Sequence, residues 1–160
     1  FENFDIENFV KTYKWGNDIQ RRTSHFGARY DYTNKNLIYD AQPFDGYIKQ
    51  IADWLKIFPV LNDSTEFYGF NQCIVNEYKR NQKINPHIDS LCFGDIIATI
   101  SLSSSTTMIM SYGDTKIPIK LNHGDIIFLT SDARYKWKHE ILPVSDSNFY
   151  RLSVTFRSIN

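Results

Sequence analysis

Residues 95–130 read DIIATISLSSSTTMIMSYGDTKIPIKLNHGDIIFLT, and this stretch decides the fold. It holds four short apolar runs, separated by turn-forming groups such as Tyr112-Gly113-Asp114 and Asn122-His123-Gly124-Asp125. Runs of this length between glycine-containing turns are typical of β-strands. We expect strands at residues 95–102, 107–112, 116–121 and 125–130, with the short Ser/Thr run 103–107 as a loop.

The same pattern continues on both sides of this stretch, with further β-like runs at residues 72–78, 137–142 and 151–159. Several short strands without intervening helices favour a sandwich or barrel over a parallel α/β sheet. A jelly roll, also called a double-stranded β-helix, is the leading architecture. We therefore predict a mainly β fold with flanking α structure, whose core spans residues 72–160.

The N-terminal part has a different pattern. Between Phe44 and Phe58 the apolar residues follow helical spacing, with Pro43 before the stretch and Pro59 after it. We expect a helix there, packed on the outside of the sheet. Residues 21–36 lack helical spacing and predict a short hairpin or an ordered loop. A chain of 160 residues suits a single domain spanning 1–160.

Charge and cysteine content narrow the class of protein. The 18 basic and 18 acidic residues balance, so a strong non-specific nucleic-acid binder is disfavoured unless the basic groups cluster. No apolar run reaches membrane-spanning length, and we expect no signal peptide. The two cysteines, Cys73 and Cys92, are too few for a disulfide framework. We expect a soluble intracellular protein without a membrane partner.

A metal-binding pattern stands at His87-Ile88-Asp89. In an extended segment, residues two apart point to the same face, so the imidazole and the carboxylate project together. His139 follows Asp89 by 50 residues, far enough for several strands to return to the same mouth. Two histidines and one carboxylate form the facial triad that binds iron(II) and leaves positions open for a keto acid and oxygen. The H-x-D motif alone recurs by chance, and His139 makes the pattern more specific.

The last strand adds a second signal. In Arg151-Leu152-Ser153-Val154-Thr155-Phe156-Arg157, the two arginines alternate with apolar residues and share a face with Ser153 and Thr155. Buried arginines need an anionic partner, and a dicarboxylate would supply one. The alternative is a pair of surface arginines on an edge strand.

Together these motifs resemble the AlkB family of iron(II)- and 2-oxoglutarate-dependent dioxygenases. The resemblance includes Asn76-Glu77-Tyr78, Gly124-Asp125 and Ala133-Arg134-Tyr135, and covers about residues 72–160. It implies iron(II), 2-oxoglutarate and O2 as cofactor and cosubstrates. By position it implies that His87, Asp89 and His139 hold the iron. The implied 2-oxoglutarate contacts are Asn76, Tyr78, Arg151, Ser153 and Arg157.

Within that family, residues 21–27 with Tyr30 and Tyr32 resemble the substrate lid of eukaryotic-type members that hydroxylate the modified wobble uridine of tRNA. The resemblance implies that residues 1–71 form a lid and its supporting helix. The substrate-binding residues would be Arg21, Arg22, His25 and Tyr30, although a solvated surface loop explains His25 equally well. Ser90 and Leu91 stand where repair members often carry acidic residues, and Glu140 replaces a common glycine.

The expected function is hydroxylation or oxidative demethylation of a modified nucleobase in nucleic acid, RNA more than DNA. Three alternatives stay open at this point. They are repair of alkylated DNA or RNA, hydroxylation of a protein side chain, and a non-catalytic jelly-roll binding module. The sequence does not indicate an oligomeric state.

Overall fold

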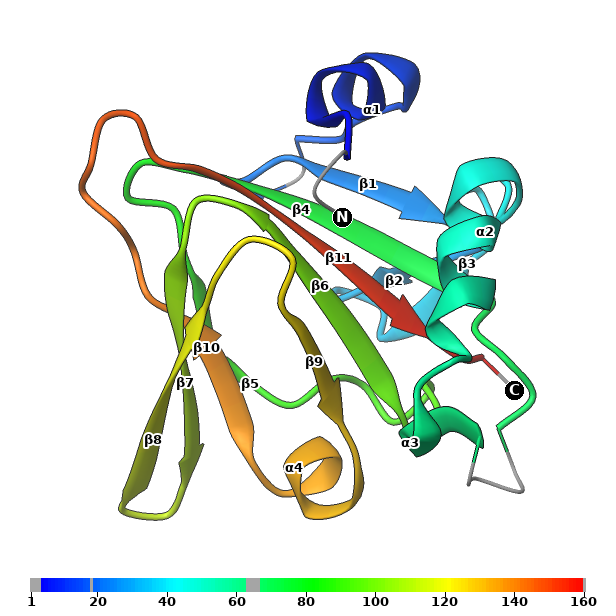
Figure 1. Cartoon of the computed structure of the whole chain (residues 1–160). Helices are drawn as coiled ribbons and strands as arrows, with labels where there is room; N and C mark the ends of the chain where they lie inside the picture. The colour runs from blue at the N-terminus through cyan, green and yellow to red at the C-terminus, as the bar shows by residue number, and fades with distance from the viewer. Residues whose placement is uncertain (1–3, 18, 63–66, 160) are drawn as a thin grey trace.

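Two antiparallel sheets form the body of the protein in a computed structural model that describes residues 4–17, 19–62 and 67–159 (Figure 1). The larger sheet has the order β1-β4-β11-β6-β9 and the smaller one β5-β10-β7-β8. This architecture confirms the predicted mainly β, jelly-roll fold. The larger sheet contains β1 (Thr23–Phe26), β4 (Gln72–Lys79), β11 (Tyr150–Arg157), β6 (Ile97–Ser103) and β9 (Ile126–Leu129). The smaller contains β5 (Ile84–His87), β10 (Lys138–Ile141), β7 (Thr106–Tyr112) and β8 (Thr115–Leu121).

All seven strands predicted from residue 72 onward are present, with no end shifted by more than two residues. The loop expected at 103–107 is shorter, because β6 ends at Ser103 and β7 begins at Thr106. The β7–β8 hairpin turns through Gly113, whose φ of +56° suits glycine at the first position of a tight turn. The sequence did not predict β5, which contains Pro86. A proline is tolerated there because β5 lies at the edge of its sheet.

Residues 21–36 do more than form the predicted hairpin. The hairpin pairs β2 (Arg29–Asp31) with β3 (Asn36–Ile38). The preceding segment, β1, instead joins the larger sheet by pairing with β4. Thr23 and Ser24 are buried in β1, so its sequence lacks the alternation of apolar and polar residues that marks a half-buried strand.

The predicted helix is α2 (Gly46–Leu55), shorter at both ends than the expected range 44–58. Pro59, expected as a stop signal, opens the short helix α3 (Pro59–Asn62), as suits a residue without a free backbone N–H. Two further short helices, α1 (Ile6–Thr12) and α4 (Ser131–Tyr135), were not predicted. Within the part of the chain that the structure describes, no helix is long and apolar enough to cross a membrane.

Two cores lie on opposite faces of the larger sheet. On the outer face, Ile48 and Leu55 of α2 pack with Val75, Val154 and Phe156 in one cluster, as predicted for this helix. The second cluster lies between the sheets and includes Tyr78, Ile97, Met108 and Phe149. Because side chains alternate along a strand, β11 turns its apolar residues outward and its polar ones into the space between the sheets.

Candidate active site

The two histidines of the predicted triad face each other across a pair of strands. His87 at the end of β5 and His139 on β10 are direct register partners, and their ring centroids lie 4.2 Å apart. Nδ1 of His87 lies 2.8 Å from the Asn85 carbonyl oxygen. A hydrogen bond to that oxygen places the ring proton on Nδ1 and leaves Nε2 as the free ligand atom.

Asp89 completes the group from outside the strand. Its Oδ1 lies 3.4 Å from Nε2 of His87 and 3.3 Å from Nε2 of His139. Because β5 ends at His87, Asp89 reaches this position from the following loop, and strand alternation alone does not place it. The ligand atoms of the three residues lie within 4.8 Å of one another, which suits one metal ion.

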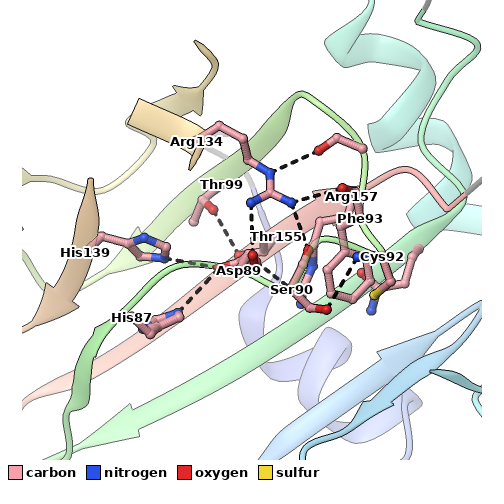
Figure 2. A network of polar contacts seen from close by, with 12 residues as sticks. His87, Asp89, Ser90, Cys92, Phe93, Thr99, Arg134, His139, Thr155 and Arg157 are labelled. Atoms are coloured by element: carbon pink, nitrogen blue, oxygen red, sulfur yellow. Dashed lines mark hydrogen bonds and ion pairs between the residues drawn. The ribbon is translucent and has the colours of Figure 1, made fainter. Parts of the chain in front are cut away.

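Arg157 stabilises the ionised form of the Asp89 carboxyl group. Its Nη1 donates to Oδ2 of Asp89 at 2.8 Å (Figure 2). Burial by itself raises the pKa of Asp89, but the charge of Arg157 and the neighbouring imidazoles of His139 and His87 outweigh it. The pKa is therefore held well below the ordinary value of a carboxyl group. Asp89 is an anion at neutral pH, as a metal ligand must be.

Strands β4 and β11 form one wall of a cavity beside these three residues. Asn76 and Tyr78 line it from β4, and Arg151, Ser153, Thr155 and Arg157 line it from β11. The structure thus turns the alternate polar residues of β11 into one cavity, as the sequence predicted. We call these six residues the β4–β11 wall.

Arg151 is the deepest cation of the wall. Its side chain is 1% exposed, and its guanidinium lies 5.2 Å from the centre of the Tyr78 ring. Nε donates to Ser101 Oγ at 2.9 Å, whereas the buried Nη1 has no hydrogen-bond partner among the described residues. Burial lowers the pKa of Arg151, because the charged guanidinium loses its hydration without gaining an anionic partner. A carboxylate against Nη1 would remove that cost.

Ser101, which supports Arg151, was not predicted from the sequence. It lies on β6, the neighbour of β11, and its place beside Arg151 follows from the register of those two strands. A serine in an apolar strand carries no distinguishing signal, so only the pairing of the strands reveals this contact.

Arg21 and the aromatic residues of the N-terminal segment lie at the mouth of the cavity. Nε of Arg21 donates to Oδ1 of Asn76 at 2.8 Å. Tyr30 packs edge-on against Tyr32 at 5.1 Å and lies 6.1 Å from Phe93 between ring centroids. An open cleft lies here, which we call the mouth. Aromatic residues, cations and residues of the metal site line it. Its lining includes Arg21, Tyr30, Tyr32, Lys35, Lys83, His87, Asp89, Phe93 and Arg157.

The structure brings Arg22 and His25 to places other than the mouth. Arg22 forms a two-pronged ion pair with Glu77, with N–O distances of 2.8 and 2.7 Å. Glu77 alternates with Asn76 and Tyr78 along β4, so this pair lies on the opposite face of the sheet. His25 is a residue of β1 rather than of a loop; its Nε2 lies 3.1 Å from Thr23 Oγ1. Neither side chain belongs to the lining of the cavity or the mouth.

Comparison with known proteins identifies the class. The chain belongs to the 2OG-Fe(II) oxygenase superfamily, whose family model matches residues 6–157. It is therefore an iron(II)- and 2-oxoglutarate-dependent dioxygenase that uses O2. This assignment sets aside the non-catalytic binding module.

Within the superfamily the chain is a member of the AlkB family. It is 31% identical over 147 residues to "tRNA (carboxymethyluridine(34)-5-O)-methyltransferase ALKBH8" of Macaca fascicularis, covering 88% of this chain and 20% of that protein. It is 26% identical over 149 residues to "Alkylated DNA repair protein ALKBH8 homolog" of Arabidopsis thaliana, covering 79% and 43% respectively. The chain thus spans a fifth and less than half of these two relatives.

Two further comparisons add a sequence relative and a solved structure of the same fold. "Uncharacterized protein L905" of Acanthamoeba polyphaga mimivirus is 30% identical over 160 residues, with 91% of this chain and 73% of that protein covered. The structure of OsALKBH1 superimposes with a TM-score of 0.67 at 15% identity, covering 92% of this chain and 80% of that one. At that identity the likeness supports the fold.

The donor set fits the metal and cosubstrate of this family. Two imidazole nitrogens and one ionised carboxylate are the ligands that non-haem iron(II) sites of oxygenases use. The unpartnered Nη1 of Arg151 lies in a cavity that also contains these ligands. The cavity therefore offers a metal site and a carboxylate site in one enclosure, as a chelating dicarboxylate requires.

Proposed function

We propose that this dioxygenase hydroxylates or oxidatively demethylates a modified nucleobase in nucleic acid, with RNA of the tRNA wobble-uridine type as the first choice. The observation that carries the proposal is the composition of the mouth. Aromatic rings and cations lie there beside His87 and Asp89, and proteins bind single-stranded nucleic acids with this combination of side chains.

In this proposal His87, Asp89 and His139 bind the iron, and the β4–β11 wall binds 2-oxoglutarate. Arg151 takes the distal carboxylate, supported by Ser153, while Asn76 and Tyr78 hydrogen-bond the cosubstrate. Arg157 remains on Asp89 and lies near the carboxylate that chelates the metal. Bound iron(II) with 2-oxoglutarate and O2 supplies the oxidising power for hydroxylation of a substrate C–H bond, and 2-oxoglutarate leaves as succinate and carbon dioxide.

The residues of the mouth bind and orient the substrate. Tyr32 is 67% exposed and edges against Tyr30, so its ring offers a face for an unstacked base. Lys35 and Lys83 line the same cleft and suit backbone phosphates on either side of that base. The net charge of the chain is zero, so such a local cluster is what a nucleic-acid site requires here. Arg22 and His25 are left out of this set because of their positions.

The names of the relatives support nucleic acid but differ on its type. The macaque protein is named for a modified uridine in tRNA, and the plant protein for repair of alkylated DNA. Demethylation of alkylated bases in DNA or RNA is therefore the second candidate function. Ser90, the residue directly after the metal aspartate, lines the mouth. Members that repair alkylated bases often carry an acidic residue at this position, so Ser90 favours the uridine substrate over the repair substrates.

The test is stimulation of 2-oxoglutarate turnover by a panel of substrates. Succinate formation is measured with O2, and an anaerobic sample serves as the blank. The substrates are anticodon stem-loops bearing modified wobble uridines, and 1-methyladenine and 3-methylcytosine in RNA and DNA. A lysine- and proline-rich peptide pool tests the protein side-chain alternative. Products are identified by mass shifts of one oxygen or one lost methyl group.

We expect the strongest stimulation by the modified uridine in RNA. Greater turnover of methylated adenine or cytosine would favour the repair function, and stimulation by peptides alone would overturn the nucleic-acid proposal. A K35A/K83A double variant should bind RNA more weakly and with a flatter salt dependence. A matched pair of exposed lysines outside the mouth, Lys11 and Lys49, provides the control variant.

A further inference from the structure

The three residues of the triad are held in different ways. His87 and His139 are fixed by the pairing of β5 with β10. Asp89 lies in the segment between β5 and β6, where residues 88–96 form no helix or strand. A carboxylate that must keep its oxygen beside two imidazoles needs another constraint on its backbone.

Arg134 of α4 supplies contacts to that backbone. Its Nη1 donates to the carbonyl oxygen of Asp89 at 3.0 Å, and its Nη2 to those of Ser90 at 2.8 Å and Phe93 at 2.9 Å. Its Nε donates to the carbonyl oxygen of Gly94 at 3.0 Å. Figure 2 shows the guanidinium inside the turn of the loop, with the Asp89 carboxylate pointing away toward the histidines.

The environment of Arg134 shows that these contacts are its main interactions. Its side chain is 1% exposed, and the one further contact described for its guanidinium is the Tyr135 ring, whose centre lies 4.7 Å away. The four carbonyl oxygens are partly or fully buried acceptors crowded together, and leaving such acceptors without donors is costly; that of Ser90 also accepts the backbone N–H of Phe93 at 3.2 Å. The guanidinium and the folded loop therefore stabilise each other, and neither is satisfied alone.

Two further ties hold the same loop. The hydroxyl of Tyr135, the residue next to Arg134, donates to Oδ1 of Asp95. The backbone N–H of Gly94 donates to the carbonyl oxygen of Ser158 at 2.9 Å, just beyond β11. The loop is thus held from α4 on one side and from the end of β11 on the other.

We propose that Arg134 is a positioning residue for the metal site, which acts by holding the backbone of Asp89 at the distance that the two imidazoles require. α4 ends at Tyr135 and β10 begins at Lys138, so one short segment positions both His139 and the loop that contains Asp89. The proposal rests on the metal ligands assigned in the proposed function.

The geometry requires arginine rather than any cation. Contacts to four carbonyl groups use the planar fork of N–H donors, which a lysine ammonium with a single nitrogen cannot reproduce. R134K keeps the charge and most of the volume but loses most of these bonds. Loss of groups that orient a metal ligand typically weakens metal binding about 10- to 100-fold.

The experiment measures Mn(II) affinity of the apo-protein by electron paramagnetic resonance, together with its thermal unfolding. Wild type, R134K, Y135F and E77Q are compared, with H87A as the variant that lacks a ligand. Glu77 is buried and ion-paired on the far face of the sheet, so E77Q lowers stability without touching the loop. It separates general destabilisation from a local effect on the site.

We expect R134K to raise the dissociation constant of Mn(II) by about 10- to 100-fold and Y135F by about threefold. E77Q should leave it within a factor of two at a comparable loss of thermal stability. Wild-type affinity in R134K, or equal weakening in E77Q, would overturn the proposal. If R134K does not fold, unchanged affinity in Y135F would do so. Mn(II) binding that H87A does not weaken would instead refute the ligand assignment.

Discussion

The β4–β11 wall and the mouth lie on two sides of the same triad and are built in opposite ways. The wall belongs to central strands, and its Asn76, Tyr78 and Arg151 are all buried. The mouth takes Tyr30 and Tyr32 from the small β2–β3 hairpin, where Tyr32 and Lys35 are exposed. The buried wall suits a constant small cosubstrate held in one geometry. The exposed mouth suits a large substrate that approaches from solvent.

The largest expected effect removes what the two regions share. H87A should abolish the visible band of iron(II) with 2-oxoglutarate and reduce succinate formation to background, because two ligands rarely hold this metal. Anaerobic absorption titration measures the first effect and succinate assay the second. H123A, which changes a histidine in a turn outside the cavity, should behave as wild type. A normal band in H87A would contradict the ligand assignment.

A change in the wall should affect the cosubstrate alone. We expect R151M to raise the KM for 2-oxoglutarate about 50-fold, because it removes a charge-assisted contact worth about 1.5–3 kcal/mol. The control is R80M, at an exposed position just beyond β4. The ratio of KM values between variant and wild type is measured at saturating iron. An unchanged KM would remove Arg151 from the cosubstrate site.

A change in the mouth should affect the substrate alone. Y32A should raise the KM for the nucleic-acid substrate about tenfold, since stacking on an aromatic ring is worth about 1–3 kcal/mol per base. Turnover of 2-oxoglutarate without substrate should stay at its wild-type rate. Tyr39, equally exposed but outside the mouth, provides the matched control Y39A. Loss of uncoupled turnover in Y32A would show that the two regions are not separate.

Arg21 joins the two regions and sharpens the comparison. The sequence suggests a role in substrate binding only, yet its Nε donates to Asn76 of the wall. We therefore expect R21A to raise both KM values, each about threefold, because one partly exposed hydrogen bond contributes about 0.5–1.5 kcal/mol. Steady-state kinetics with each reactant varied in turn measures both. A change in the KM for the substrate alone would mean that Arg21 acts only in the mouth.

The smallest expected effect concerns the back of the wall. Burial by itself raises the pKa of Glu77, but hydrogen bonds from Arg22 and Tyr150 outweigh it and lower the pKa below the ordinary value. A carboxyl group whose pKa is lower in the folded state stabilises the fold above its unfolded pKa. That contribution is lost as the pH falls through the folded pKa.

E77Q should therefore reduce the free energy of unfolding by about 1–2 kcal/mol at neutral pH. The difference from wild type should shrink below pH 4.5, the ordinary pKa of this group. Urea unfolding of both proteins between about pH 3 and pH 7 measures the trend, because the ordinary pKa of a carboxyl group, about 4, lies inside that range. A difference that stays constant with pH would mean that the pKa of Glu77 is the same in the folded and unfolded states.

Local patterns in the sequence determined much of this protein. The alternation along residues 151–157 already separated the cavity face from the core face, because successive side chains of a strand point in opposite directions. The helical stripe likewise identified the face of α2 that packs on the sheet. The family motifs selected His87, Asp89 and His139, which the structure brings together.

Only the tertiary structure decided which distant residues meet. Arg22 lies next to Arg21 in sequence, yet it pairs with Glu77 behind the sheet while Arg21 enters the cavity. The partners of Arg151 and Arg134 depend on strand register and on the path of a loop, since a buried donor bonds whichever acceptor the fold brings to it. Periodicity records which face a residue occupies, and the packing of the elements determines what that face meets.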